Sequence, residues 1–263
     1  MILKNVTEGG GGIHRVLPAE YLRLGLSQAD GPQLDMMASV AKHASRGRFI
    51  TFEGLDGCGK TTQLERLAGE LRSEGIAVVT TREPGGTEIG ERIRAVLLDS
   101  RTAGLDARAE MALMFASRAQ QIAQVILPAL EAGQWVLCDR FTDSTEAYQG
   151  GGRQLGSEAV LRCHEALCRG LWPDLTILMD TDVSASVARA RRRNKAAADE
   201  DSDENRFEQE NYAFFTRVRN AFLEIARREP QRVVLVDARP PLEVVHPQIV
   251  RVVRERLMEG AQL

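Results

Sequence analysis

The chain has 263 residues, and its 34 Lys and Arg against 37 Asp and Glu give a formal net charge of −3 at pH 7. This balance argues against a general nucleic-acid coat protein, which carries a large basic excess. A hydrophobic fraction of 43% excludes wholesale disorder. No uncharged apolar stretch approaches the ~18 residues of a membrane span, and the N-terminus lacks the apolar run of a secretory signal.

The four cysteines favour a reducing compartment. They form no Cys-x-x-Cys pair and match no common zinc spacing, and they are Cys58, Cys138, Cys163 and Cys168. A chain of this length does not need disulfides to build a core. We therefore expect a cytoplasmic protein with reduced thiols, with neither a membrane nor a nucleic acid as a partner.

Residues 1–47 differ from the remainder of the chain. They contain the run Gly9 to Gly12 and show no sustained hydrophobic periodicity. Because Met36 and Met37 precede the first strong strand pattern, one hypothesis is that translation starts there. The alternative is a disordered or regulatory tail. In either case we expect the folded domain to comprise residues 48–263.

From residue 48, short apolar runs alternate with long amphipathic segments. The runs are β-rich and apolar without alternation, as in strands buried on both faces of a parallel sheet; they comprise residues 49–52, 76–80, 135–138, 175–179 and 233–236. Helical patterns cover residues 61–73, 88–98, 108–132, 157–168 and 207–228. This alternation predicts an α/β/α sandwich around a five-stranded parallel sheet.

The most specific motif is Gly54-Leu-Asp-Gly-Cys-Gly-Lys60-Thr61, which fits G-x-x-x-x-G-K-[ST] between a predicted strand and a predicted helix. Glycines let successive backbone N–H groups point at phosphate oxygens, and the helix N-terminus adds its positive end. The motif predicts binding of ATP phosphates by Gly54, Leu55, Asp56, Gly57, Cys58, Gly59, Lys60 and Thr61. Cys58 is either a small residue that fits the loop or a thiol made reactive by the helix N-terminus.

Two further features extend this site. A buried strand ends at Asp139, which with the Thr61 hydroxyl is a candidate Mg²⁺ ligand. Arg140 follows at the sheet edge where ligands bind in this fold class.

A charged segment lies later in the chain, where basic residues 189–195 precede acidic residues 199–204. Residues 189–206 contain scarcely an apolar residue larger than Ala, so we expect that they cannot join a core. They form either a solvated loop or a charged lid, and the phosphate site favours the lid.

Three classes of P-loop protein fit such a motif to different degrees. A GTPase needs an Asn-Lys-x-Asp motif, which Asn194-Lys-Ala-Ala197 lacks. Large motors need a longer chain. A small kinase of the nucleoside monophosphate type fits the size and the lid. A nucleotide-dependent switch protein with little turnover stays open as the alternative of a different class.

Four blocks, in order, resemble thymidylate kinases from about residue 48 to the C-terminus. They are Phe52-Glu-Gly-Leu-Asp-Gly-Cys-Gly-Lys-Thr-Thr62, Thr81-Arg-Glu-Pro-Gly-Gly-Thr87, Asp139-Arg-Phe-Thr-Asp-Ser-Thr-Glu-Ala-Tyr-Gln-Gly-Gly-Gly152 and Asn205-Arg-Phe-Glu-Gln-Glu210. The resemblance implies Mg²⁺-assisted phosphorylation of dTMP to dTDP by ATP, in a homodimer. The long helix at residues 108–132 is a candidate interface.

The resemblance also implies residue roles. It places catalytic groups at Lys60, Asp56, Arg140, Arg189, Arg191 and Arg193. It places dTMP contacts at Glu83, Pro84, Arg94, Met114, Phe115, Arg118, Arg140, Thr145, Tyr148 and Gln149. Within this set, Arg94 and Arg140 hold the acceptor phosphate, Arg118 bonds the thymine edge, and Tyr148 lies against the sugar.

Two departures from the family pattern matter. The position four residues before Arg118, usually a base-stacking Phe, is Met114, whereas Phe115 lies three residues before it. Both spacings fall on one helical face, so either side chain could cover the base. Gly57 stands where some members carry a basic residue. The chain thus resembles the bacterial group, whose transfer arginine comes from the lid, and leaves open which lid arginine acts.

Overall fold

The computed structural model describes residues 46–102, 104–197, 206–207 and 210–258. Residues 1–45, with Met36, Met37 and most of the predicted N-terminal extension, lie outside the described residues. So does the acidic half of the charged segment. In the described part, no helix is both long and apolar enough to cross a membrane.

Five strands form one parallel sheet in the order β2-β3-β1-β4-β5. They are β1 (Phe49–Glu53), β2 (Val78–Arg82), β3 (Trp135–Asp139), β4 (Leu175–Asp180) and β5 (Val233–Asp237). Alternate side chains of the central strand β1 enter opposite cores: Ile50 and Phe52 belong to one cluster, and Phe49 to the other. The predicted five-stranded sheet is therefore confirmed, with an apolar layer on both faces.

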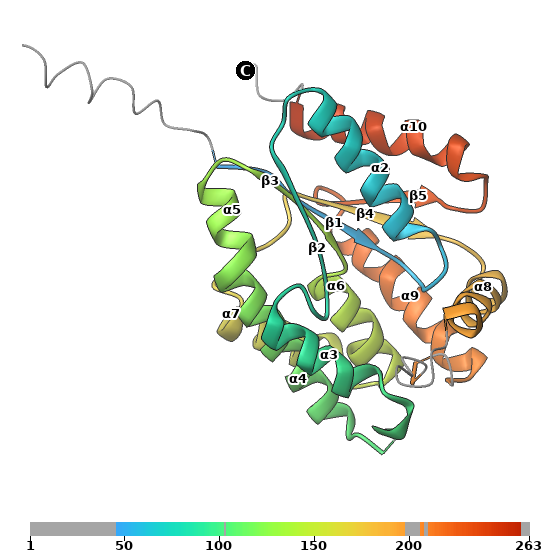
Figure 1. Cartoon of the computed structure of the whole chain (residues 1–263). Helices are drawn as coiled ribbons and strands as arrows, with labels where there is room; N and C mark the ends of the chain where they lie inside the picture. The colour runs from blue at the N-terminus through green and yellow to red at the C-terminus, as the bar shows by residue number, and fades with distance from the viewer. Residues whose placement is uncertain (1–45, 103, 198–205, 208–209, 259–263) are drawn as a thin grey trace, which may run out of the picture. The chain divides into compact units, whose positions relative to one another are not determined.

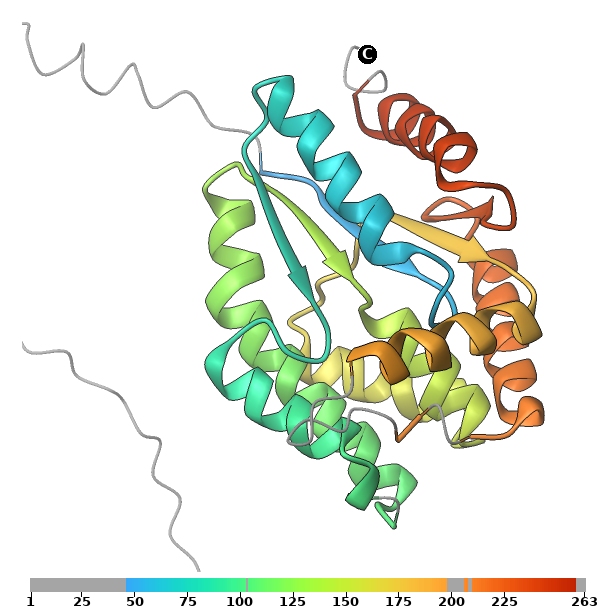
Figure 2. The same cartoon turned by 45° about the vertical axis from the view of Figure 1, so that its right-hand side comes forward.

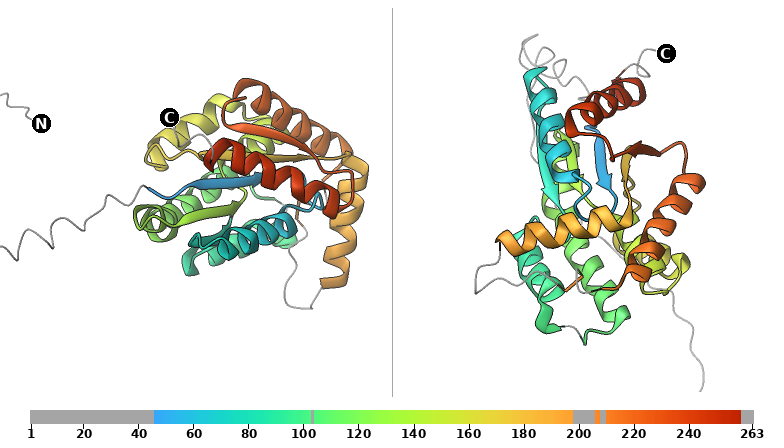
Figure 3. Two further views of the ribbon diagram at one scale, coloured as in Figure 1. Left: turned by 90° about the horizontal axis from the view of Figure 1, so that it is seen from above. Right: turned by 90° about the vertical axis from the view of Figure 1, so that its right-hand side faces the viewer.

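The helices cover both faces of the sheet (Figures 1 and 3). One face carries α2 (Lys60–Ser73) and α10 (Leu242–Val253). The other face and its flank carry α3 (Glu88–Leu98), α4 (Ala107–Gln121), α5 (Leu127–Glu131), α6 (Thr142–Thr145), α7 (Ser157–Leu167) and α9 (Tyr212–Arg228). This is the predicted three-layer α/β/α sandwich.

The long helix predicted at residues 108–132 is continuous but irregular. A π-helical turn, η2 (Ile122–Ile126), separates α4 from α5. Pro128 lies in the first turn of α5, where its missing N–H and its ring disturb regular α-helical bonding. Beyond η2, α5 returns the chain to β3.

The helix predicted at residues 207–228 begins later, at Tyr212, because Asn211 caps it: the Asn211 side-chain oxygen accepts a hydrogen bond from the Phe214 N–H at 2.9 Å. Phe207 belongs to a separate turn. The strand predicted at residues 76–80 is also shifted, to β2. Three helical regions were not predicted: α8 (Val183–Ala197), α10, and α6 with its π-helical continuation η3 (Glu146–Gly152).

The charged segment begins as a helix, α8 (Val183–Ala197), and its first half packs against the domain. Ser186 and Ala190 are buried there, so the expectation that residues 189–206 could not join a core is wrong for Ala190. The small side chains explain the difference, because they let the helix backbone approach closely. In Figure 2, α8 (orange) runs across the carboxyl ends of the strands, where the arrowheads point.

Candidate active site

The loop between β1 and α2 has the conformation that its motif predicts. Gly54, Gly57 and Gly59 have φ values of 130°, 78° and 96°, a region that side chains strongly disfavour. Space is also lacking, because a Cβ on Gly57 would lie 2.7 Å from the Ser186 carbonyl oxygen of α8. The loop is thus shaped by its glycines and covered by the charged helix.

Lys60, the first residue of α2, folds back over this loop. Its Nζ donates hydrogen bonds to the carbonyl oxygens of Gly54, at 3.2 Å, and Leu55, at 2.9 Å. The side chain is 5% exposed and lines the adjoining cavity. An ammonium group held over a ring of backbone donors can neutralise phosphate oxygens placed there.

Thr61 and Asp139 meet across the end of the sheet, with the Thr61 hydroxyl donating to Asp139 Oδ2 at 2.5 Å. Both offer hard oxygen ligands of the kind that Mg²⁺ takes, usually one or two from protein with phosphate and water completing the shell. The described residues contain no cluster of three or more metal-binding side chains. The donor set therefore fits Mg²⁺ bound together with a nucleotide.

Two cavities adjoin the carboxyl ends of the central strands. The first, here called the P-loop cavity, encloses about 2080 Å³ including its open mouth. Its lining includes Gly57, Gly59, Lys60, Thr61, Asp139 and Arg189. The second cavity encloses about 710 Å³, and its lining includes Pro84, Leu98, Met114, Arg118, Phe141, Ser144, Thr145, Tyr148, Gln149 and Phe207. Both are lined by Asp56, Glu83, Arg94 and Arg140, so the cavities meet there.

Arg140 and Asp56 form an ion pair at this junction, with Nη2 to Oδ1 at 2.7 Å. Arg140 also donates to Ser144 Oγ at 2.9 Å, and Tyr148 donates its hydroxyl to Asp56 Oδ2 at 2.9 Å. Burial raises the pKa of Asp56, but the charges of Arg140 and Lys60 outweigh it and hold that pKa well below its usual range. Asp56 is therefore ionised at neutral pH.

Arg140 adopts a left-handed backbone, with φ of 74°, at a cost of about 1–3 kcal/mol for a residue with a side chain. Its guanidinium spans Gly54 of the loop, Asp56 and Ser144. This places a fixed two-pronged donor between the cavities, the geometry suited to a phosphate group.

Arg118 is the largest fully buried side chain of the structure and lines the second cavity. Its Nε donates to Glu83 Oε2 at 2.7 Å and its Nη2 to Thr145 Oγ1 at 2.8 Å. Burial raises the pKa of Glu83 to about 7, although the Arg118 charge lowers it. Arg118 Nη1 and Glu83 Oε1 have no hydrogen-bond partner in the described part of the chain. Buried orphan groups that line a cavity indicate a polar ligand.

Met114 and Phe115 have different surroundings. Met114 lines the second cavity, whereas Phe115 is fully buried in the core and does not line it. The Arg118 guanidinium lies 4.8 Å from the centre of the Phe115 ring, so Phe115 supports Arg118 from the core side. The expectation that Phe115 could cover a bound base is therefore corrected.

The predicted lid arginines also differ in position. Arg189 lines the P-loop cavity, and its Nη2 donates to Thr181 Oγ1 at 3.1 Å. Arg191 is exposed and donates to the Glu210 carbonyl oxygen at 3.4 Å. Arg193 is on α8, but its side chain lies outside the described residues. Among the described arginines of α8, Arg189 is thus the one beside the phosphate loop.

Cys58 is 2% exposed and belongs to the core cluster under α2. Burial raises the pKa of its thiol, although the charge of Lys60 opposes the shift. Of the two expectations for Cys58, the small residue that fits the loop is correct, and the reactive thiol is wrong.

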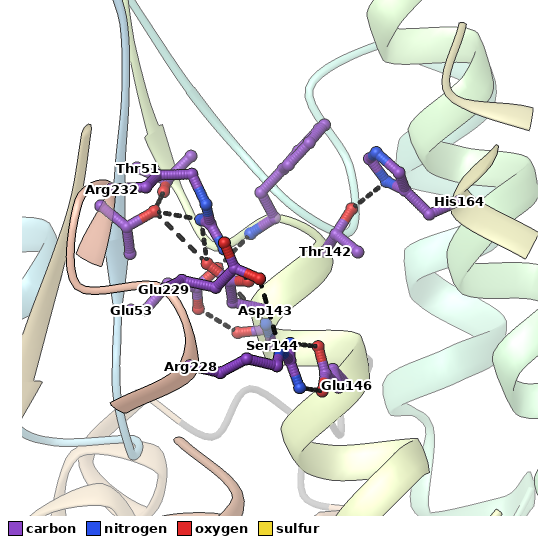
Figure 4. A network of polar contacts seen from close by, with 12 residues as sticks. Thr51, Glu53, Thr142, Asp143, Ser144, Glu146, His164, Arg228, Glu229 and Arg232 are labelled. Atoms are coloured by element: carbon purple, nitrogen blue, oxygen red, sulfur yellow. Dashed lines mark hydrogen bonds and ion pairs between the residues drawn. The ribbon is translucent and has the colours of Figure 1, made fainter. Parts of the chain in front are cut away.

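A buried carboxylate missed from sequence, Glu53 at the end of β1, lies beside Ser144 (Figure 4). It accepts hydrogen bonds from the Ser144 hydroxyl at 2.5 Å and the Phe141 N–H at 2.7 Å. Since Ser144 Oγ also accepts from Arg140, a chain of contacts joins Glu53 to the arginine. Burial, reinforced by the charge of Asp143, raises the pKa of Glu53 to about 8.

Four residues that line the second cavity were not predicted: Leu98, Phe141, Ser144 and Phe207. Phe141 and Ser144 lie inside the quoted block that begins at Asp139, and Phe207 lies inside the block at residues 205–210, so their sequence neighbours were the available signal. Leu98 ends a predicted helix and carries no such signal.

The comparisons with known proteins agree with this geometry. A family model described as thymidylate kinase matches residues 52–249. Thymidylate kinase of Magnetococcus marinus is 48% identical over 212 residues, covering 80% of this chain and 97% of that protein. The Pseudomonas putida W619 enzyme is 49% identical over 197 residues, covering 75% and 91%. The crystal structure of thymidylate kinase from Ehrlichia chaffeensis aligns with a TM-score of 0.64 and 32% identity, covering 79% and 99%. The chain therefore belongs to the thymidylate kinase family.

Proposed function

We propose that the P-loop cavity holds the triphosphate of ATP and that the second cavity holds dTMP. As a thymidylate kinase, the chain phosphorylates dTMP to dTDP with ATP. The observation that carries the assignment of the two sites is their junction, because Asp56, Glu83, Arg94 and Arg140 line both cavities. A γ-phosphoryl group and an acceptor phosphate would meet there.

In this arrangement Lys60 and the loop N–H groups bind the β- and γ-phosphates, and Arg189 covers them from α8. Arg94 and Arg140 grip the acceptor phosphate, so that two anions are held in line despite their repulsion. The attacking atom is already a phosphate oxygen, so no strong base is needed. Thr61 and Asp139 would hold Mg²⁺, which neutralises charge on the transferred group.

The second cavity supplies the remaining contacts. Arg118, Thr145 and Gln149 face the base edge, Met114 covers its ring, and Tyr148 lies against the sugar. We assign the charged segment at residues 189–206 the role of a lid, supported by the packing of α8 on Gly57. Closure of such a lid excludes water and suppresses futile ATP hydrolysis.

The test is a coupled ADP-release assay with MgATP and, in turn, dTMP, dUMP, dCMP, UMP, AMP and GMP. Turnover that strongly favours dTMP is expected. Discrimination against dUMP rests on one methyl group and is worth only about 1–3 kcal/mol, so slower dUMP turnover is also expected. Turnover on a purine monophosphate would overturn the assignment of the second cavity, and ATP binding without acceptor-dependent turnover would favour a switch protein.

We also propose a cytoplasmic homodimer. All four cysteines are free thiols. Ile89 and Val96 on α3 are 50% and 46% exposed, and α3 packs beside α4, part of the predicted interface helix. A second copy would cover this apolar surface. Light scattering should give twice the chain mass for the native protein and the monomer mass for V96E.

A further inference from the structure

Glu110, in the first turn of α4, is fully buried and does not line either cavity. Its Oε1 accepts a hydrogen bond from Gln149 Nε2 at 2.7 Å and a longer one from Arg153 Nε at 3.2 Å. Its Oε2 accepts from Arg153 Nη2 at 3.1 Å and forms an ion pair with Arg206 Nη1 at 2.7 Å. Two guanidinium groups therefore compensate the buried charge, and the remaining partner, Gln149, is a side chain of the second cavity.

This contact fixes the orientation of the Gln149 amide. An ionised carboxylate can only accept hydrogen bonds, so the NH₂ group of Gln149 must face Glu110. Gln149 Oε1, at the other corner of the amide, has no hydrogen-bond partner in the part of the chain that the structure describes. Because Gln149 lines the second cavity, the atom left for a ligand is an acceptor.

Arg118 contributes the complementary group. Glu83 and Thr145 occupy its Nε and Nη2, which leaves Nη1 as a donor without a partner in the described residues. Besides the orphan Glu83 Oε1, the cavity thus offers one donor, from Arg118, and one acceptor, from Gln149. Thymine and uracil carry a carbonyl beside a ring N–H, which match this pair, whereas cytosine carries an amino group beside a bare ring nitrogen and mismatches both.

We propose that Glu110 is a positioning residue that sets the pyrimidine preference of the enzyme by holding the Gln149 carbonyl toward the base. The inference rests on the proposed function, since it concerns dTMP bound in the second cavity. Glu110 itself touches no substrate. Glu110 acts on the base through Gln149. The guanidinium groups of Arg153 and Arg206 bind its other carboxylate oxygen, Oε2.

The variant E110Q tests this directly. The Oε2 position must still accept from Arg153 and Arg206, so the introduced amide places its oxygen there and its NH₂ toward Gln149. Gln149 then has to turn its own oxygen to that NH₂ group and present its NH₂ to the base. One of the two mismatches with cytosine is thereby removed, and a mismatch with the thymine ring N–H is created.

Glu146 provides a matched control. It is also a fully buried carboxylate paired with an arginine, Arg228, at 2.7 and 2.8 Å, but it does not line the second cavity. Figure 4 shows the ion pair of Glu146 and Arg228 near Ser144 and Glu53. E146Q removes a comparable charge without touching Gln149, so its effect on stability or on overall rate serves as the baseline.

The measurement is kcat/KM for dTMP, dUMP and dCMP, with competition constants where dCMP turnover is slow. For E110Q we expect the dTMP/dCMP ratio to fall by about tenfold or more. The dTMP/dUMP ratio should stay unchanged, because the two bases share the same hydrogen-bonding edge. E146Q should change neither ratio. A merely structural role for Glu110 would lower all three values together.

A dTMP/dCMP ratio within about twofold of wild type in E110Q, or an equal fall in E146Q, would overturn the inference. If E110Q does not fold, E110D keeps the charge but withdraws it from Gln149, and the same ratio should fall. Q149L must also lose the discrimination, and retention there would sink the idea independently. Absence of dTMP turnover in the wild type would instead refute the proposed function.

Discussion

The two cavities of this enzyme are built in opposite ways. The P-loop cavity takes its phosphate-binding groups from consecutive residues of one loop, shaped by Gly54, Gly57 and Gly59. The second cavity gathers side chains from the end of β2, from α3 and α4, and from the α6–η3 segment. In the proposed function, phosphate is bound by the backbone of one loop, whereas the base is bound by side chains that only packing brings together.

The positively charged side chains of the two cavities also differ in how they are held. Lys60 and Arg189 of the P-loop cavity bond to neutral carbonyl or hydroxyl oxygens, which they can exchange for phosphate. Arg118 of the second cavity is locked by the buried carboxylate of Glu83. In the proposed function, the charges that neutralise the transition state are thus left available, while the charge that contacts the base is held rigid.

The largest expected effect is the loss of kcat when Lys60 in the P-loop cavity is replaced. K60A should lower kcat by about 10³-fold, because in the proposed function the Lys60 ammonium group neutralises charge on the transferred phosphoryl group. Steady-state kinetics with MgATP and dTMP measure this. R66A, on the exposed side of the same helix in an ion pair with Glu243, is the control and should change kcat little. A K60A enzyme within about tenfold of wild type would contradict the role of Lys60.

Replacing Arg118 in the second cavity should change both the affinity for dTMP and the stability of the protein. R118M leaves Glu83 buried without its counter-charge, so the free energy of unfolding should fall by about 3–5 kcal/mol. R118M/E83Q removes both charges and should recover most of that loss, but not the affinity for dTMP. Urea unfolding and the KM for dTMP separate the two effects. Recovery of dTMP affinity in the double variant would show that Arg118 is structural only.

The lid arginines give a smaller contrast within α8. R189A should lower kcat by about ten- to a hundredfold, because Arg189 lines the P-loop cavity and can add charge to the γ-phosphate. R191A should have little effect, since Arg191 is exposed and bonds to the Glu210 carbonyl. Single-turnover rates of both variants decide the matter, and an equal loss in the two would argue against a specific role for Arg189.

The last expected effect is a pH dependence of stability. The pKa of Glu53 is raised from 4.5 to about 8, first by burial, so between these values the folded state binds more protons than the unfolded state. Stability should therefore fall as pH rises from 4.5 to about 8, and level off above. In E53Q the fall should be shallower, because the raised pKa of Glu83 acts in the same direction but the pKa of His164, lowered by burial from 6.5 to about 4, opposes it below pH 6.5. Thermal unfolding across this range measures the slope, and an unchanged slope would remove Glu53 as its source.

Sequence patterns anticipated the sheet and most of the helices that flank it, because strands buried on both faces read as continuous apolar runs. They missed α10 and the α6–η3 segment, and they treated the basic part of α8 as unable to pack. Ser186 and Ala190 of α8 are too small to produce a hydrophobic stripe in the sequence pattern. Their small side chains nevertheless let α8 pack closely against Gly57.

For the site, the phosphate loop and the set of residues around it could be predicted from the sequence, because glycine spacing and a lysine at the helix start act locally. Packing was needed to distinguish Met114 from Phe115, which are neighbours on one helix, and Arg189 from Arg191 on another. It also decided the orientation of Gln149, through a carboxylate 39 residues away in the chain. Hydrogen-bond direction in a buried pocket depends on which partners packing supplies, and no local pattern encodes that choice.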